Sequence, residues 1–282
     1  MHESDRKTTP GEQSHLANGG RSTFHRSNQW IYEVADFDEW ANKNSVTPYL
    51  FAEERYLVTR FFDKDSATLE AGTGGGRVAL ALRDAGYTDL HAFDFVPASI
   101  AEARGRDPRG AIHFDVMDAT DLQYAADTFD QLIYPSAMIS DIESTAQRRK
   151  AIQEAQRVLR PGGLAIMTAL SFETAHRSRV HAAFIVYLTA LRAVRRSSRP
   201  PNDLPWLRVR RGINWSALAD LGPHLHWYTI TEFAQDLLQS GLSIEALGTR
   251  WQIDRDHLCS SVDELAAEPS ADMFYVVCRK QR

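Results

Sequence analysis

The residues best suited to chemistry form a glycine-rich run, Glu70-Ala71-Gly72-Thr73-Gly74-Gly75-Gly76-Arg77. The run lies between a short apolar stretch and a helical pattern. Glycines there let the backbone turn sharply and let a ligand approach it, while free amides at a helix start attract an anionic group. We therefore predict a site for a nucleotide-like ligand. The G-x-G-x-G spacing is one residue shorter than the dinucleotide-binding G-x-G-x-x-G, which disfavours NAD.

Acidic residues follow the next two apolar stretches. Asp94, followed by Phe95, ends the second stretch, where a carboxylate can accept both hydrogen bonds of a ribose diol. The pair Asp118-Ala119 follows the third stretch, and Asp118 there could equally cap a turn. The acidic positions and the glycine run support each other as one ligand site.

Three residues near the fourth stretch are candidates for the reaction itself. Tyr134 and Ser136 come at the end of this stretch, and ligands of open α/β sheets lie outside the carboxyl ends of the strands. Asp141 is a candidate base, although a helix cap explains it as well. Arg77 is either a surface arginine or a partner for a ligand carboxylate. Positioning and packing are sufficient roles for Tyr134 and Ser136.

The elements that position these residues alternate between short apolar strands and helical patterns. This alternation is typical of an α/β fold with a doubly wound, mostly parallel sheet. The predicted helices include Gly76–Ala85, Pro97–Arg104, Thr145–Leu159 and one opened by the T-x-x-E capping box at Thr229. The predicted strands are Ala67–Ala71, Leu90–Phe93, Ala111–Phe114, Phe129–Tyr134, Leu164–Ala169, Leu242–Leu247 and Met273–Cys278.

Residues 171–226 interrupt this rhythm. They contain one apolar helical stripe from Val180 to Val194, nine arginines and no lysine. We predict an inserted helical lid. Its arginines have three alternative roles: a solvated helix face, a site for an anionic substrate, or a surface attracted to acidic lipid.

Taken in order, these motifs make the chain resemble the class I S-adenosylmethionine-dependent methyltransferases. The family pattern E/D-x-G-x-G-x-G is matched from Glu70 to Gly76, and the R-V-L-R-P-G-G turn by residues 157–163. Phe129-Asp130 matches the F-D of the fourth strand, whereas Met117 replaces a common glycine. The resemblance implies seven strands, the last antiparallel, with S-adenosylmethionine as co-substrate. It implies a cofactor site of Glu70, Gly72, Thr73, Gly74, Gly76, Asp94, Phe95, Asp118, Ala119 and Tyr134.

Composition limits the remaining possibilities. The 282 residues carry a net charge of -5, which argues against general nucleic-acid binding. Residues 1–28 are polar and predict a disordered tail, leaving 29–282 as one methyltransferase domain in a soluble, cytoplasmic protein without a transmembrane segment. The two cysteines lack CxxC spacing and His224 and His226 lack nearby carboxylates in the sequence, so we predict no metal site. Four aromatic residues could shelter the sulfonium or pin an N-terminal helix: Trp30, Tyr32, Phe37 and Trp40.

The expected activity is methyl transfer to an O or N nucleophile of a small or medium-sized metabolite. Alignment of donor and acceptor can supply most of the acceleration, with a base needed only for a protonated acceptor. The alternatives are a macromolecular (RNA or protein) or lipid-linked acceptor, a nucleotide-binding oxidoreductase, and a non-catalytic partner subunit of the same fold. The sequence leaves the acceptor and the oligomeric state open.

Overall fold

In the computed structural model, the described residues are 48–142, 144–175, 179–206, 208–209, 212–213, 215–271 and 273–281. The predictions for the tail and for the four N-terminal aromatic residues lie outside these ranges. None of the helices in the described part of the chain has the length and apolar character needed to cross a membrane.

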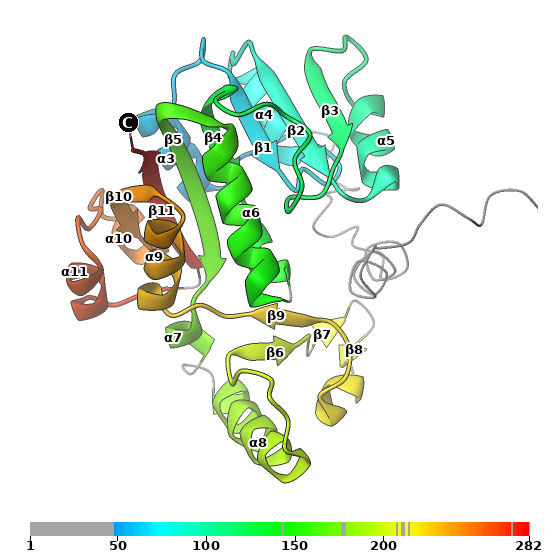
Figure 1. Cartoon of the computed structure of the whole chain (residues 1–282), viewed down its shortest axis with the longest axis vertical. Helices are drawn as coiled ribbons and strands as arrows, with labels where there is room; N and C mark the ends of the chain where they lie inside the picture. The colour runs from blue at the N-terminus through cyan, green and yellow to red at the C-terminus, as the bar shows by residue number, and fades with distance from the viewer. Residues whose placement is uncertain are drawn as a thin grey trace, which may run out of the picture.

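A seven-stranded sheet with the order β10-β11-β5-β4-β1-β2-β3 forms the centre of the fold (Figure 1). The pairs from β5 to β3 are parallel, whereas β11 runs antiparallel to both β5 and β10. This confirms the predicted mostly parallel, doubly wound sheet. The strands are β1 (Thr68–Ala71), β2 (Leu90–Asp94), β3 (Ile112–Val116), β4 (Phe129–Tyr134), β5 (Leu159–Leu170), β10 (Leu242–Gly248) and β11 (Met273–Lys280).

Apolar side chains alternate between two cores, one on each face of the sheet. Leu132 and Tyr134 belong to the core beneath the helices of residues 145–158 and 230–239. Ile133, between them in the sequence, belongs to the core on the other face. Such strands are buried on both faces, which is why they read as nearly continuous apolar runs. The helices that cover the sheet are α3 (Ala52–Phe61), α4 (Arg77–Asp84), α5 (Pro97–Gly105), α6 (Thr145–Val158) and α9 (Ile230–Gln239).

Local signals explain where several helices begin. Gly76 precedes α4 with φ +86°, a left-handed conformation that favours glycine. Pro97 occupies the first turn of α5, where its missing amide is not needed. Thr229 caps α9 by accepting a 3.2 Å hydrogen bond from the amide of Glu232. These starts match the predicted helices.

The inserted segment, residues 171–226, corrects the expectation of a helical lid. Its helices are joined by short antiparallel strands, of which β6 pairs Asp203 with His226 of β9. Strands of two or three residues are too short to leave an alternating pattern in the sequence. The elements are α7 (Phe172–Ala175), α8 (Arg179–Arg195), β6 (Asp203–Pro205), β7 (Arg208–Val209), β8 (Gly212–Ile213), η2 (Trp215–Ala219) and β9 (His224–His226).

The two ends of the inserted segment lie side by side on the main sheet. The amide of Tyr228 donates to the carbonyl of Leu170, and the amide of Phe172 donates to the carbonyl of Tyr228, both at 2.8 Å. The arrow of β5 points toward β6 and β9 (Figure 1). The segment therefore extends beyond the carboxyl ends of the parallel strands.

Candidate functional site

The predicted ligand residues meet at one edge of the sheet because their strands are parallel and aligned. Glu70 of β1 is in register with Ala92 of β2 and with Ile133 of β4. The chain winds to one side through β2 and β3 and to the other through β4 and β5, so β1 and β4 mark the switch point. Ligands of open α/β sheets bind at that point, outside the carboxyl ends of the strands.

Glu70 holds the glycine loop against the start of α4. Its Oε2 accepts hydrogen bonds from the Thr73 hydroxyl at 2.7 Å and from the Ala79 amide at 2.8 Å. The side chain is 2% exposed. Burial raises the pKa of Glu70 to about 7, against the lowering effects of Thr73, Arg77 and the Ala79 amide. A cation bound next to Glu70 would therefore favour the ionised carboxylate over the protonated form.

The three glycines have different surroundings. A Cβ on Gly72 would lie 2.6 Å from Cγ of Met138, and one on Gly76 would lie 3.2 Å from Cβ of Ala103. A Cβ on Gly74 would meet no described atom within 4 Å. The backbone of Gly74 thus borders open space where a ligand can approach.

Asp94 faces the same loop from the end of β2. Its Oδ2 accepts from the Gly74 amide and its Oδ1 from the Val96 amide, each at 2.9 Å. The side chain is buried, and burial raises the pKa of Asp94 despite the backbone donors of Val96, Gly74 and Phe95. Phe95 itself is half-buried. The carboxylate is held in place by main-chain amides beside the open face of Gly74.

Asp118 and Ala119 follow β3 and lie in a turn. Oδ1 of Asp118 accepts from the amide and the hydroxyl of Thr120, both at 2.9 Å. Ala119 packs in the core that also contains Tyr134. The capping role of Asp118 is present, and its role in the ligand site stays a prediction.

The segment after β4 has a strained backbone. Ser136 and Ala137 both have positive φ values, 54° and 56°. The hydroxyl of Thr168 on β5 donates to the carbonyl of Tyr134, while its oxygen accepts from the amide of Ala137, both at 2.7 Å. Strained residues held by their surroundings are common at functional sites. Thr168 carries no motif in the sequence, which is why it was not predicted.

Arg77 is not the surface arginine that was one of its two predicted roles, and its role toward a ligand carboxylate stays a prediction. The side chain is 7% exposed and donates two 2.7 Å hydrogen bonds to the carboxylate of Glu54 on α3. It also donates to the Ser136 hydroxyl at 3.0 Å and lies over the ring of Phe51. This buried cation therefore fixes Ser136 rather than facing solvent.

Tyr134 and Asp141 differ in their access to the sheet edge. The Tyr134 ring is fully buried, and its hydroxyl has no hydrogen-bond partner among the described residues. Burial raises the pKa of Tyr134, with Glu154 and Asp118 adding to the effect. The phenol therefore stays protonated at neutral pH. Asp141 ends the short helix η1 (Met138–Asp141) and is only half-buried.

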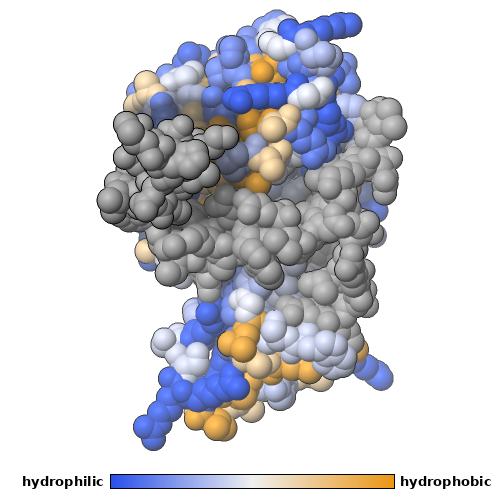
Figure 2. All heavy atoms as spheres, turned by 90° about the vertical axis from the view of Figure 1, so that its right-hand side faces the viewer, coloured by the Kyte–Doolittle hydropathy of each residue, from blue (hydrophilic) through white to orange (hydrophobic). Residues whose placement is uncertain are grey.

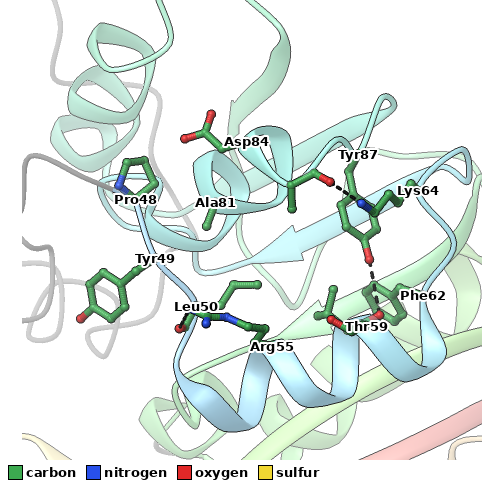
Figure 3. A pocket seen from close by; sticks show the side chains of 12 residues that line it. Pro48, Tyr49, Leu50, Arg55, Thr59, Phe62, Lys64, Ala81, Asp84 and Tyr87 are labelled. Carbon is green, nitrogen blue, oxygen red and sulfur yellow. Dashed lines mark hydrogen bonds between the residues drawn. The ribbon is translucent and has the colours of Figure 1, made fainter.

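A cavity of about 460 Å³ lies between α3 and α4 (Figure 3). Its wall includes Leu50 and Arg55 on one side and Ala81 and Tyr87 on the other. None of the residues predicted to bind the cofactor lines it. We assign it no part in the site at the sheet edge.

The inserted segment combines buried ion pairs with an apolar surface. Arg192 is buried and binds both carboxylate oxygens of Asp220, so it does not belong to a solvated face. Hydrophobic side chains gather at the lower end of the molecule (Figure 2), where α8 and η2 lie in Figure 1. The exposed apolar residues of these two elements are Val180, Val186, Tyr187, Val194, Trp215 and Leu218.

Comparison with known proteins agrees with this geometry. Residues 69–167 match the family described as a methyltransferase domain. The chain is 29% identical over 196 residues to a demethylmenaquinone methyltransferase of Clavibacter sepedonicus, covering 68% of this chain and 70% of that protein.

Solved structures share the fold. An S-adenosylmethionine-dependent methyltransferase from Methanosarcina mazei superposes with a TM-score of 0.58 at 17% identity, covering 80% of this chain and 97% of that one. Another from Mesorhizobium loti gives a TM-score of 0.53 at 17% identity, covering 82% and 98%. At 17% identity these structures support the fold alone. The family match over residues 69–167 identifies a methyltransferase domain.

Proposed function

We propose that this chain, which contains a methyltransferase domain and shares the fold of S-adenosylmethionine-dependent methyltransferases, methylates an O or N nucleophile of a small or medium-sized metabolite. The acceptor is held between the sheet edge and the inserted segment 171–226. The observation that carries the proposal is the pairing of the open Gly74 backbone with the Asp94 carboxylate.

The residues at the sheet edge fit the cofactor. Glu70, whose pKa burial has raised, suits a neighbouring methionyl ammonium group. Asp94 suits the ribose diol, and Asp118-Ala119 suits the adenine. When bound, the cofactor supplies an electrophilic methyl group on a sulfonium. An acceptor aligned at the sheet edge would displace the methyl group from sulfur, leaving a neutral thioether, and the acceptor proton would pass to Asp141 or to water.

The chain's own contribution is mainly alignment. Arg77 and Thr168 fix the segment after β4, which places Ser136 at the edge. A buried, protonated Tyr134 cannot accept a proton, so we assign it a packing role beneath the cofactor site. Asp141 remains the candidate base for an acceptor that arrives protonated. Positioning can account for much of the rate in such a displacement.

A lipid-linked acceptor is the second candidate. The exposed apolar residues of α8 and η2 lie on the inserted segment, beside exposed arginines such as Arg179 and Arg195. Apolar and basic side chains together are typical of segments that rest on acidic lipid. The relative from Clavibacter sepedonicus is named for such an apolar acceptor.

Cofactor binding is tested by calorimetric titration with S-adenosylmethionine and its demethylated product. We expect binding in the micromolar range and its loss in Gly74→Arg, which fills the open space beside the loop. Gly110→Arg is the matched control, because Gly110 also has positive φ and open surroundings. Competition by NAD at equal strength, or no binding by the folded protein, would refute the proposal.

The acceptor is identified with methyl-labelled S-adenosylmethionine and fractionated metabolites, lipids and macromolecules. Label in the polar metabolite fraction supports the first candidate, and label in the lipid fraction supports the second. Label confined to RNA or protein would contradict both. No label in any fraction, with cofactor binding intact, would favour a non-catalytic partner subunit.

A further inference from the structure

Four side chains with metal-binding donor atoms converge beside the carboxyl end of β10, a strand that β11, β5 and β4 separate from β1 in the sheet. They are His257, Cys259, Glu264 and Glu268, and their nearest ligand atoms all lie within 4.8 Å of one another. They belong to α11 (Val262–Ala267), its flanks and the loop after α10 (Arg250–Ile253). The helices α10 and α11 lie beside β10 at one side of the molecule (Figure 1).

The distances within the cluster resemble the edges of a coordination tetrahedron. Nε2 of His257 lies 3.2 Å from Oε1 of Glu268 and 3.6 Å from Oε1 of Glu264. With bonds of about 2.1 Å, two ligands of a tetrahedral zinc ion lie about 3.4 Å apart. The imidazole and the two carboxylates thus already surround a space of the right size, and the thiol has at most a short distance to close.

Each carboxylate is held by one oxygen and presents the other to the cluster. Oε2 of Glu264 accepts from the amide and the hydroxyl of Ser260, at 2.7 and 2.9 Å. Oε2 of Glu268 accepts from the Gln252 side chain at 3.1 Å. In both residues Oε1 faces His257. Outer hydrogen bonds of this kind orient the ligands of protein metal sites.

Cys259 is fixed from the other side by the sheet. Its amide donates to the carbonyl of Leu247 at 2.8 Å, and its carbonyl accepts from the Leu247 amide at 2.9 Å. The side chain is fully buried, whereas the His257 side chain is 47% exposed. The cluster therefore has a rigid inner wall and an outer side through which an ion can enter.

We propose that His257, Cys259, Glu264 and Glu268 bind a zinc ion. A thiolate and an imidazole favour zinc over calcium and magnesium, which prefer oxygen ligands alone. Four protein ligands leave no open position, so the site is structural rather than catalytic. The ion neutralises most of the charge of the two carboxylates and the thiolate, and it ties the segment 257–268 to β10.

The test uses the full-length chain, stripped with chelator and titrated with Co²⁺ and then Zn²⁺. We expect one ion per chain, tetrahedral d–d bands and a thiolate-to-cobalt charge-transfer band that zinc abolishes. Cys259→Ser should lose the charge-transfer band, and Cys278→Ser should keep it, because Cys278 lies in β11, outside the cluster. This band separates the site from any histidine elsewhere in the chain.

Two ligands that are not buried keep the test decisive if Cys259→Ser fails to fold. His257→Gln and Glu264→Gln should each weaken zinc affinity at least tenfold, since loss of even an outer hydrogen-bond partner of a ligand typically costs about 10- to 100-fold, while the calorimetric affinity for S-adenosylmethionine stays unchanged. A cobalt spectrum without the charge-transfer band, or equal zinc affinity in wild type and both variants, would overturn the proposal. Neither result depends on methyltransferase activity.

Discussion

Oδ2 of Asp94 accepts a 2.9 Å hydrogen bond from the amide of Gly74, joining the end of β2 to the glycine loop that follows β1. The second oxygen accepts from Val96, so the carboxylate is anchored from two sides. A ribose diol can bind such a carboxylate without any rearrangement of the main chain. The proposed cofactor site thus has this carboxylate in place without a ligand.

Asp94→Asn should weaken S-adenosylmethionine binding while leaving the protein folded. The amide keeps the size of the side chain but loses the charge and half of the acceptor capacity, and hydrogen bonds to charged groups contribute roughly 1.5 to 3 kcal/mol. We expect a loss of affinity of about ten- to a hundredfold by calorimetry. Asp89→Asn, at the exposed start of the same β2 region, should bind as wild type does. Equal affinity of both variants would remove Asp94 from the site.

Gly72→Ala should destabilise the protein more than Gly74→Ala. Both positions have positive φ, which costs an alanine about 1 to 2 kcal/mol. Only at position 72 does the added Cβ also meet Met138, at 2.6 Å, so Met138 and the start of η1 must shift. Urea denaturation measures the difference. Equal losses of stability would show that Met138 moves without cost.

The sequence predicts the sheet, the glycine loop and Asp94 because these depend on local patterns. The long-range contacts left no such signal: Arg77 and Glu54 pair across the α3–α4 interface, and no periodicity links them. The same reason explains the missed strands β6 and β9, each only three residues long. Capping was predicted at Thr229, but the carboxylate of Glu232 binds His226 instead of closing a capping box.

The histidine of the proposed zinc site is not one that the sequence analysis weighed for metal binding. The sequence directs attention to His224 and His226, which alternate along β9 and face Asp220 and Asp203. His257 and Cys259 gain their carboxylates only when α11 folds back toward β10. Convergence of this kind depends on tertiary structure, so spacing alone does not reveal it.

The stability of the wild type should fall as pH rises from 5 to 8, partly through Glu70. Because burial raises the pKa of Glu70 from 4.5 to about 7, the folded state binds more protons than the unfolded state between these values. The contribution is complete below pH 4.5 and is lost through pH 7, amounting to about 3 kcal/mol. In Glu70→Gln this part of the decline should vanish in denaturation curves taken at each pH. The exposed variant Asp65→Asn should keep the wild-type slope, and a parallel decline in Glu70→Gln would refute the assignment.

Breaking the Arg77–Glu54 pair should be costly. Both side chains are buried, and removing one partner leaves an uncompensated charge, which typically costs 3 to 5 kcal/mol. We expect Glu54→Gln to lose about 3 kcal/mol in urea denaturation. Asp84→Asn disturbs the exposed pair with Arg83 and should change stability by less than about 1 kcal/mol. Similar losses in the two variants would contradict the buried pair's importance.

The inserted segment should loosen as pH rises above 6.5, because the protonated ring of His226 joins it to α9. Its ring nitrogens lie 2.5 Å from Asp203 of β6 and 2.9 Å from Glu232 of α9, so both donate when the ring is protonated. Burial lowers the pKa of His226 and Arg148 opposes the charge, but the two carboxylates raise it above 6.5 overall. The stabilisation is therefore complete below pH 6.5 and is lost as pH rises through the higher pKa of the folded state.

Limited proteolysis tests this dependence on His226. Cleavage between Arg179 and Arg199 should accelerate with pH in the wild type, after correction for the pH dependence of the protease on a peptide. His226→Gln should be cleaved roughly tenfold faster at pH 6 and depend little on pH, whereas His181→Gln should follow the wild type. A wild-type cleavage rate that is constant across this range would exclude His226 as the group that holds the segment.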